Sequence, residues 1–265
     1  MPALAKLKLR DPHELRERCV DCTIRHRAVC SYAGPTELEL LDSIKFYRSF
    51  EPGQEIVAAG ETTDFLGSVV DGVVALSKTM VDGRRQTVGL MFPSDFVGRP
   101  MRPVALYDAT AVTPVRLCLF MRGRFERLVT QMPSLEKRLL EMTLDELDAA
   151  RDWMLLLGRK TAQEKIATFL TILARRSAAL ENRAPEDGLT FQLPLSREAI
   201  ADYLGLTIET VSRQVTALKK GGVVELTDAR SLRVPDYGAL LEAAGEDADG
   251  GWICLLYTSD AADEE

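Results

Sequence analysis

The sequence predicts an α+β fold in which an antiparallel β-roll is followed by one long helix and a pair of short C-terminal helices. Three observations predict it: short apolar runs separated by turn signals between about residues 50 and 120, an unbroken helical period after residue 133, and two helical segments joined by a tight turn after residue 196. With 265 residues, 46% of them hydrophobic, the chain can bury the cores of two compact domains.

The expected roll contains the apolar runs SVVDGVVALSKTM, QTVGLMF and PVRLCLF. Turn signals separate its strands at Glu51-Pro52-Gly53, Asp71-Gly72, Asp82-Gly83 and Pro93-Ser94-Asp95. We expect residues 36–132 to form this domain. Residues 1–35 are polar, basic and cysteine-bearing, and they form an arm too short to fold on hydrophobic burial alone. A bound metal would organise such an arm.

The long helix is predicted from SLEKRLLEMTLDELDAARDWMLLLG, which runs to Gly158 without a breaker over about 25 residues, or ~38 Å. One apolar stripe, formed by Leu135, Leu139 and Met142, can pack on the roll. A second stripe, the seam, consists of Leu140, Leu144, Leu147, Ala150, Met154 and Leu157. We interpret residues 133–158 as a dimerisation helix, although periodicity alone equally allows a helix buried within one chain.

The C-terminal helical pair has the spacing of a helix-turn-helix. A short helix from Arg197 to Leu204 precedes the turn Gly205-Leu206-Thr207, and a second helix starts near Ile208 with Thr207 as its N-cap. The apolar residues Val211, Val215 and Leu218 share one face of the second helix, which is expected to bury against Ile200 and Leu204. Residues 159–240 are therefore the expected DNA-binding domain.

The opposite face of the second helix carries the side chains that could read DNA: Glu209, Ser212, Arg213 and Thr216, followed by Lys219 and Lys220. A carboxylate can accept a hydrogen bond from cytosine N4, and a guanidinium can donate two to guanine. Glu209 and Arg213 could therefore read one G·C pair, or form an ordinary surface ion pair worth ~0.3 to 0.5 kcal/mol. The helix-turn-helix spacing favours DNA reading, with the lysines on phosphates.

The net charge of -7 does not argue against nucleic acid, because residues 241–265 hold eight acidic residues and no basic one. The rest of the chain carries 33 basic residues against 32 acidic ones. We interpret residues 241–265, with Cys254, as a disordered or non-native tail. The chain has no run of eighteen apolar residues and no apolar stretch near its N-terminus of the kind a secretory signal requires, so we expect a cytoplasmic protein without a membrane partner.

The cysteines point to metal or redox chemistry rather than disulfides, because their number is odd and the compartment is reducing. Cys19-x2-Cys22-x7-Cys30 supplies three local thiols, and Cys118 lies far away on an expected strand. Four thiolates suit Zn²⁺ and an iron-sulfur cluster equally well. His13 and His26 could complete a zinc site, and Cys118 could instead be a buried core residue.

The run SREAIADYLGLTIETVSR resembles the C-terminal helix-turn-helix of the Crp/Fnr superfamily, and Glu209, Ser212 and Arg213 match its FNR-type reading triplet. The resemblance extends from about Cys19 to Asp236 and includes the PSDFVG turn. It implies a cyclic-nucleotide-binding-like roll and a winged helix-turn-helix. It also implies a homodimer on double-stranded, palindromic DNA with TTGAT-like half-sites, and RNA polymerase as a further partner.

The same resemblance implies a 4Fe-4S cluster held by Cys19, Cys22, Cys30 and Cys118, and hence an oxygen-responsive activator of anaerobic and microaerobic genes. The C-x2-C-x7-C spacing departs from the C-x2-C-x5-C of the best-known FNR proteins and is similar to the FnrN/FnrL-type subgroup. We expect no enzyme, because no dinucleotide-binding, nucleophile-elbow or paired-carboxylate motif is present.

Two alternatives within the same fold are a cyclic-nucleotide-responsive regulator and a regulator with a structural zinc. The first requires, in family terms, a G-E-L…R-S-A cassette. Here the stretch reads FVGRPMRPVALYDATAV, which lacks the glutamate and has Asp108-Ala109-Thr110 in place of Arg-Ser-Ala. We therefore expect no cyclic nucleotide to bind.

Overall fold

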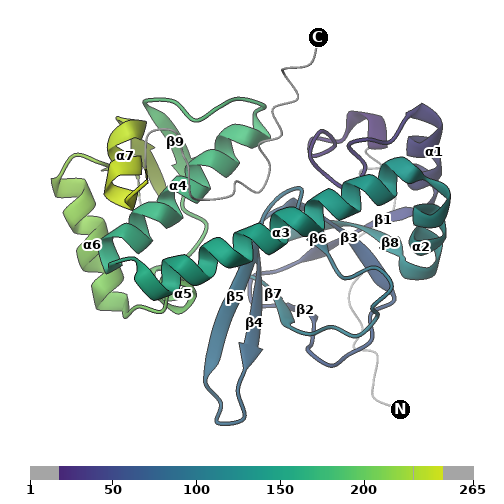
Figure 1. Ribbon diagram of the computed structural model, residues 1–265, viewed down its shortest axis with the longest axis horizontal. Helices are drawn as coiled ribbons and strands as arrows, with labels where there is room; N and C mark the ends of the chain where they lie inside the picture. The colour runs from purple at the N-terminus through teal and green to yellow at the C-terminus, as the bar shows by residue number, and fades with distance from the viewer. Residues whose placement is uncertain (1–17, 229, 247–265) are drawn as a thin grey trace.

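The computed structural model describes residues 18–228 and 230–246, and it has the predicted α+β architecture. A β-roll and a C-terminal helical domain lie along one helix, α3 (Pro133–Arg159), which crosses the whole molecule (Figure 1). The helix ends one residue beyond the predicted end at Gly158. None of the helices in the described ranges combines the length and apolar character needed to cross a membrane.

The roll consists of two four-stranded antiparallel sheets with the strand orders β1-β8-β3-β6 and β2-β7-β4-β5. Its strands are β1 (Lys45–Phe50), β2 (Glu55–Val57), β3 (Phe65–Asp71), β4 (Val74–Thr79), β5 (Arg85–Met91), β6 (Phe96–Val97), β7 (Asp108–Ala111) and β8 (Val115–Met121). Each predicted turn signal joins two of these strands. At Gly72 and Gly83 the φ angles are 84° and 86°, a left-handed conformation that glycine adopts without steric cost.

The two faces of the β1-β8-β3-β6 sheet are buried in different cores. Because side chains alternate along a strand, Leu117 and Leu119 of β8 fill the interior of the roll, whereas Cys118 and Phe120 face outward. The outer face is covered by the arm, α1 (Pro35–Ile44), α2 (Arg122–Gln131) and the first half of α3. The stripe of Leu135, Leu139 and Met142 packs into this outer layer, as predicted.

The C-terminal domain contains α4 (Ala162–Leu180), β9 (Leu189–Gln192), α5 (Arg197–Leu204), α6 (Ile208–Lys220), β10 (Glu225–Leu226), β11 (Ser231–Val234) and α7 (Tyr237–Ala244). The order β10-β11-β9 forms the wing of a winged helix-turn-helix. Arg176 of α4 forms an ion pair with Asp95 at 2.8 Å, and the rings of Trp153 on α3 and Tyr203 on α5 stack at 4.0 Å. These contacts dock the domain on the roll and on α3.

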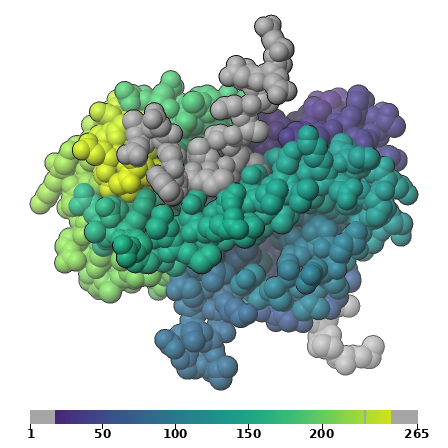
Figure 2. All heavy atoms as spheres, in the orientation of Figure 1, coloured from purple at the N-terminus to yellow at the C-terminus, as the bar shows by residue number. Residues whose placement is uncertain are grey.

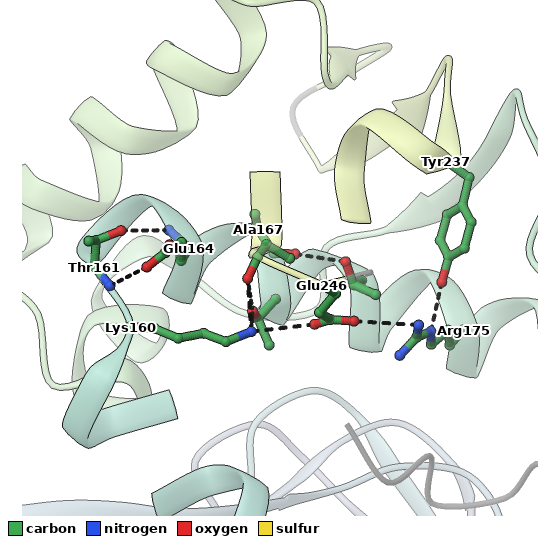
Figure 3. Close-up of polar contacts among 10 residues, drawn as sticks. Lys160, Thr161, Glu164, Ala167, Arg175, Tyr237 and Glu246 are labelled. Atoms are coloured by element: carbon green, nitrogen blue, oxygen red, sulfur yellow. Dashed lines mark hydrogen bonds and ion pairs between the residues drawn. The ribbon is translucent and has the colours of Figure 1, made fainter. Parts of the chain in front are cut away.

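A buried ion cluster fixes the junction between α3 and α4 (Figure 3). The ammonium of Lys160 donates to the Thr168 hydroxyl at 2.7 Å and to the carbonyl of Ala244 at 2.8 Å. The Glu246 carboxylate, whose side chain has no exposed surface, lies 3.5 Å from Lys160 and 3.4 Å from Arg175. The end of α7 is thereby tied to the point where the long helix enters the C-terminal domain.

The expected boundary between residues 240 and 241 is wrong, because it cuts through α7. Leu240, Leu241 and Ala244 are buried in the domain core, and Glu246 belongs to the ion cluster. The acidic composition of residues 241–265 concealed a short helix whose apolar face is buried. Cys254 and His13 lie outside the described residues.

Leu240→Ala tests whether α7 is part of the cooperative fold. Leu240 has no exposed surface, so its truncation leaves a cavity and should lower the free energy of unfolding by about 2 to 5 kcal/mol. Urea unfolding followed by circular dichroism measures the change. Glu242→Ala, at an exposed position of the same helix, should change it by less than about 0.5 kcal/mol. Equal effects of the two substitutions would contradict the burial of α7.

Candidate cysteine site and nucleic-acid interface

The four cysteines predicted to bind a metal come together in the outer layer of the β1-β8-β3-β6 sheet. Cys118 on β8 is 9% exposed, and Cys19, in the short 3-10 helix η1 (Cys19–Asp21), is 7% exposed. Cys22 and Cys30 are half-buried against the same layer. All four thiols are free of disulfide bonds. The fold thus brings the remote cysteine to the three local ones.

The arm is held in this position by its neighbours on both sides. Three of its apolar residues, Ile24, Ala28 and Val29, are buried. The peptide N–H of Cys19 donates to the Asp42 carboxylate of α1 at 2.8 Å, and the guanidinium of Arg138 on α3 donates to the carbonyl of Arg27 at 2.7 Å. The segment between Cys22 and Cys30 is therefore attached directly to the long helix.

Burial raises the pKa of three of these thiols, because a thiolate loses its hydration in the protein interior. The pKa rises to about 11 for Cys19 and to about 12 for Cys30, and that of Cys118 is raised as well. Ionisation of Cys19, Cys30 or Cys22 would raise the pKa of Cys118 further, so the four thiols lie within electrostatic reach of one another. Such thiols stay protonated at neutral pH until a bound cation displaces the proton.

The donor set consists of four thiols, a ligand type that suits Zn²⁺ and an iron-sulfur cluster alike. In a tetrahedral zinc site with bonds of about 2.3 Å the ligand sulfurs are about 3.8 Å apart. Within residues 18–228 and 230–246, no three His, Cys, Asp or Glu side chains converge closely enough to hold a single metal ion. The Nε2 atom of His26 lies 3.3 Å from the carbonyl oxygen of Ala179 on α4.

The helix-turn-helix has the local structure that the sequence predicts. Thr207 caps α6 by accepting a hydrogen bond from the N–H of Thr210, and Gly205 makes the turn with a φ of 63°. The inner face of α6 is buried against α5 through the predicted residues Val211, Val215, Leu218, Ile200 and Leu204. This packing fixes the direction in which the outer face of α6 points.

The predicted reading residues are all exposed on that outer face: Glu209, Ser212, Arg213, Thr216 and Lys219. The alternative of a surface ion pair is not realised here, since none joins Glu209 to Arg213 among the described residues. The helix N-terminus and the Thr207 hydroxyl lower the pKa of Glu209, which keeps its carboxylate ionised. The Thr216 hydroxyl donates to the carbonyl of Ser212 at 2.8 Å.

The seam of α3 is uncovered along most of its length. Figure 2 shows the helix as a continuous ridge on one face of the molecule. Leu140 and Met154 are 60% and 66% exposed, and Leu144, Leu147 and Ala150 are exposed as well. Leu157 differs, because it is half-buried against the core of the C-terminal domain. The chain therefore presents a row of apolar side chains without a partner among its own described residues.

Sequence reasoning missed three side chains around the cysteines: Lys45, Tyr47 and Ser68. The Lys45 ammonium lies 3.5 Å from Cys19 Sγ, and Tyr47 and Ser68 pair with Cys118 from the strands on either side. Burial, followed by the charge of Cys118, raises the pKa of Tyr47. The alternate positions 45 and 47 indicate one strand face, but nothing in the sequence indicates which strand lies beside it.

The fold and these two sites define a class of protein, a two-domain helix-turn-helix transcription regulator. Two family models match the chain, a cyclic nucleotide-binding domain over residues 47–132 and a Crp-like helix-turn-helix domain over residues 164–243. The chain belongs to the Crp/Fnr family of DNA-binding transcription regulators and is not an enzyme, as the sequence predicted.

Two relatives and one solved structure document this membership. The chain is 56% identical to the transcriptional activator protein FnrL of Cereibacter sphaeroides over 92% of this chain and 99% of the relative. It is 39% identical to the nitrogen fixation regulation protein FixK of Bradyrhizobium diazoefficiens over 78% of this chain and 86% of the relative. The structure of FixK2 from Bradyrhizobium japonicum superimposes with a TM-score of 0.68 at 34% identity, covering 77% of this chain and 98% of that one.

Proposed function

We propose that this protein is an oxygen-responsive transcription activator in which Cys19, Cys22, Cys30 and Cys118 hold a 4Fe-4S cluster. The observation that carries the proposal is the convergence of the three arm thiols and Cys118 in one buried layer. The donor set fits such a group, because it offers four free thiols in one buried layer. When bound, the cluster supplies a centre that oxygen destroys.

The protein's own residues then connect the cysteines to α3. Arg138 lies on the buried face of α3, and its guanidinium bonds the arm between Cys22 and Cys30. Without a bound group, the arm would lack a tie to Cys118 and would be held only by its apolar contacts and hydrogen bonds. The support of α3 on this side then weakens. Because the seam lies on the opposite face of the same helix, a shift of α3 changes the surface available for dimerisation.

The dimer proposed here joins two α3 seams, since the exposed row of leucines needs an apolar partner. Two recognition helices would then read the two halves of a palindromic site in successive major grooves. The proposed target has TTGAT-like half-sites, on which the exposed Glu209 and Arg213 would contact one G·C pair and Lys219 a phosphate. RNA polymerase is the proposed further partner at anaerobic and microaerobic promoters.

We propose that this roll does not take a cyclic nucleotide. An acidic side chain, Asp108 at the start of β7, stands where the family cassette has an arginine for the phosphate. Its carboxylate accepts a hydrogen bond from the peptide N–H of Ala59 at 2.8 Å. A carboxylate at this point repels a phosphate instead of pairing with it.

Cys118→Ala tests whether Cys118 is a ligand of the cluster or only a packed residue of the core. The protein purified without oxygen should be brown, should contain about four iron atoms per chain, and should bleach in air. The variant should lose both iron and dimer, because three thiolates remain and the arm is no longer tied to the roll. Iron analysis and anaerobic sedimentation measure the two properties.

The matched control for this experiment is Cys254→Ala, which should keep iron and dimer. A simple core role for Cys118 predicts a loss of only about 1 to 2 kcal/mol of stability with full iron content. That result, or stoichiometric zinc without sulfide in the wild-type protein, would contradict the proposal.

Leu144→Glu tests the proposed dimer. A charge placed in the centre of the seam would be buried against a second apolar seam, so the anaerobic protein should sediment as a monomer. Its affinity for the palindrome should fall by about 10²-fold or more, because the two half-sites are no longer bound together. Val81→Glu introduces the same charge at an exposed apolar residue of the β4-β5 hairpin and should leave the dimer intact. If the Leu144→Glu variant is still a dimer, the seam is not the dimer interface.

Arg213→Ala tests the reading of DNA. Removal of a bidentate contact to guanine should cost about 1 to 3 kcal/mol on the palindrome and relax the preference at that G·C pair. Titration of labelled duplexes, with each base pair substituted in turn, measures both effects. Lys219→Ala should instead weaken binding to all DNA sequences alike and reduce the dependence of the affinity on salt concentration. A uniform loss for Arg213→Ala would identify Arg213 as a phosphate contact.

A further inference from the structure

Two hydroxyl groups flank Cys118 in its sheet. β1 and β3 are the strands on either side of β8, and the strand register places Tyr47 and Ser68 directly opposite Cys118. Directly opposed residues of an antiparallel sheet point to the same face. Tyr47, Cys118 and Ser68 therefore form one row, and this row faces the arm that carries the other three cysteines.

Both hydroxyls are buried without a hydrogen-bond partner. Ser68 is 3% exposed, and neither its Oγ nor the Oη of Tyr47 has a partner among the described residues. A hydroxyl gives up its hydrogen bonds to water when it is buried, so it is stable there only beside an acceptor. Within the row, Cys118 stands between Tyr47 and Ser68, so an acceptor bound to its sulfur would lie on the side of the sheet that both hydroxyls share.

The ammonium of Lys45 lies on the same face of the sheet as this row. Lys45 lies two residues before Tyr47 on β1 and so on the same face. Its side chain is 5% exposed, and its Nζ is 3.5 Å from Cys19 Sγ and 2.6 Å from the Asp42 carboxylate. Asp42 anchors the ammonium next to the thiol. The guanidinium of Arg116 also stacks over the Tyr47 ring, at 4.4 Å. Positive charge is thus concentrated beside a site built for thiolates.

We propose that Tyr47, Ser68 and Lys45 form a donor wall, hydrogen-bonding to cluster sulfurs and setting how readily the cluster is reduced and how fast air destroys it. This inference rests on the proposed 4Fe-4S cluster. The hydroxyls and the ammonium donate, and the sulfide or thiolate sulfurs accept. Each bond favours the reduced, more negative state of the cluster over the oxidised state, so it raises the reduction potential.

The test uses full-length protein reconstituted without oxygen, as wild type and as Tyr47→Phe, Ser68→Ala and Lys45→Met. The equilibrium constant for adding one electron to the cluster is measured by a mediated redox titration, and the decay of cluster absorption in air is followed in parallel. We expect each variant to lower that constant by up to about tenfold, which is ~59 mV for a one-electron couple. Each variant should also bleach faster than the wild type.

Three controls separate a donor effect from a general disturbance. Tyr107→Phe and Ser77→Ala remove hydroxyls elsewhere in the roll, the second on the buried face of the opposite sheet, and both should behave as wild type. Lys45→Arg keeps the cation and should restore the potential that Lys45→Met lowers. Iron and sulfide are determined for every sample. Wild-type protein without iron and sulfide overturns the cluster itself, whereas fully loaded variants with wild-type potential and bleaching overturn only the donor wall.

Discussion

The packing of the cysteine-bearing arm on the outer face of the β1-β8-β3-β6 sheet is the contact on which the other parts of the structure depend. The arm has too few apolar side chains to fold by itself, and it acquires a defined shape only between α1, α3 and the sheet. That placement carries Cys19, Cys22 and Cys30 to Cys118. It also buries one stripe of α3, which leaves the opposite stripe of this helix exposed.

The long helix connects this contact to the DNA-binding domain without any intermediate chain of loops. Its first half forms part of the cysteine layer, and its last turns contribute Leu156 and Trp153 to the packing of the C-terminal domain. The cluster of Lys160, Arg175 and Glu246 then fixes the junction with α4. One helix therefore contacts both the arm and the C-terminal domain, and it carries the seam on its exposed face.

The roll keeps the architecture of a cyclic nucleotide-binding domain, while the cysteines proposed to hold the cluster lie outside its interior. Strand β8 shows the separation most clearly, because Leu117 and Leu119 fill the inner core while Cys118 faces outward. In the proposed mechanism the roll is a scaffold, and the sensing chemistry belongs to its outer face. Lys45 and Tyr47 of β1 lie on that same face, with the Lys45 ammonium 3.5 Å from Cys19 Sγ and Tyr47 opposite Cys118 in the strand register.

Features that depend on near neighbours in the chain were determined by the sequence alone: the turns of the roll, the N-cap of α6, the two stripes of α3 and the exposed face around Arg213. Each follows from local geometry, which residue type and spacing specify. Features that depend on contacts between segments far apart in the sequence were decided only by the tertiary structure. Burial of Leu240, rather than local composition, extends the domain through α7. Strand register placed Tyr47 and Ser68 beside Cys118, and the docking of the arm brought the four thiols together, because contacts between remote segments depend on how whole elements pack.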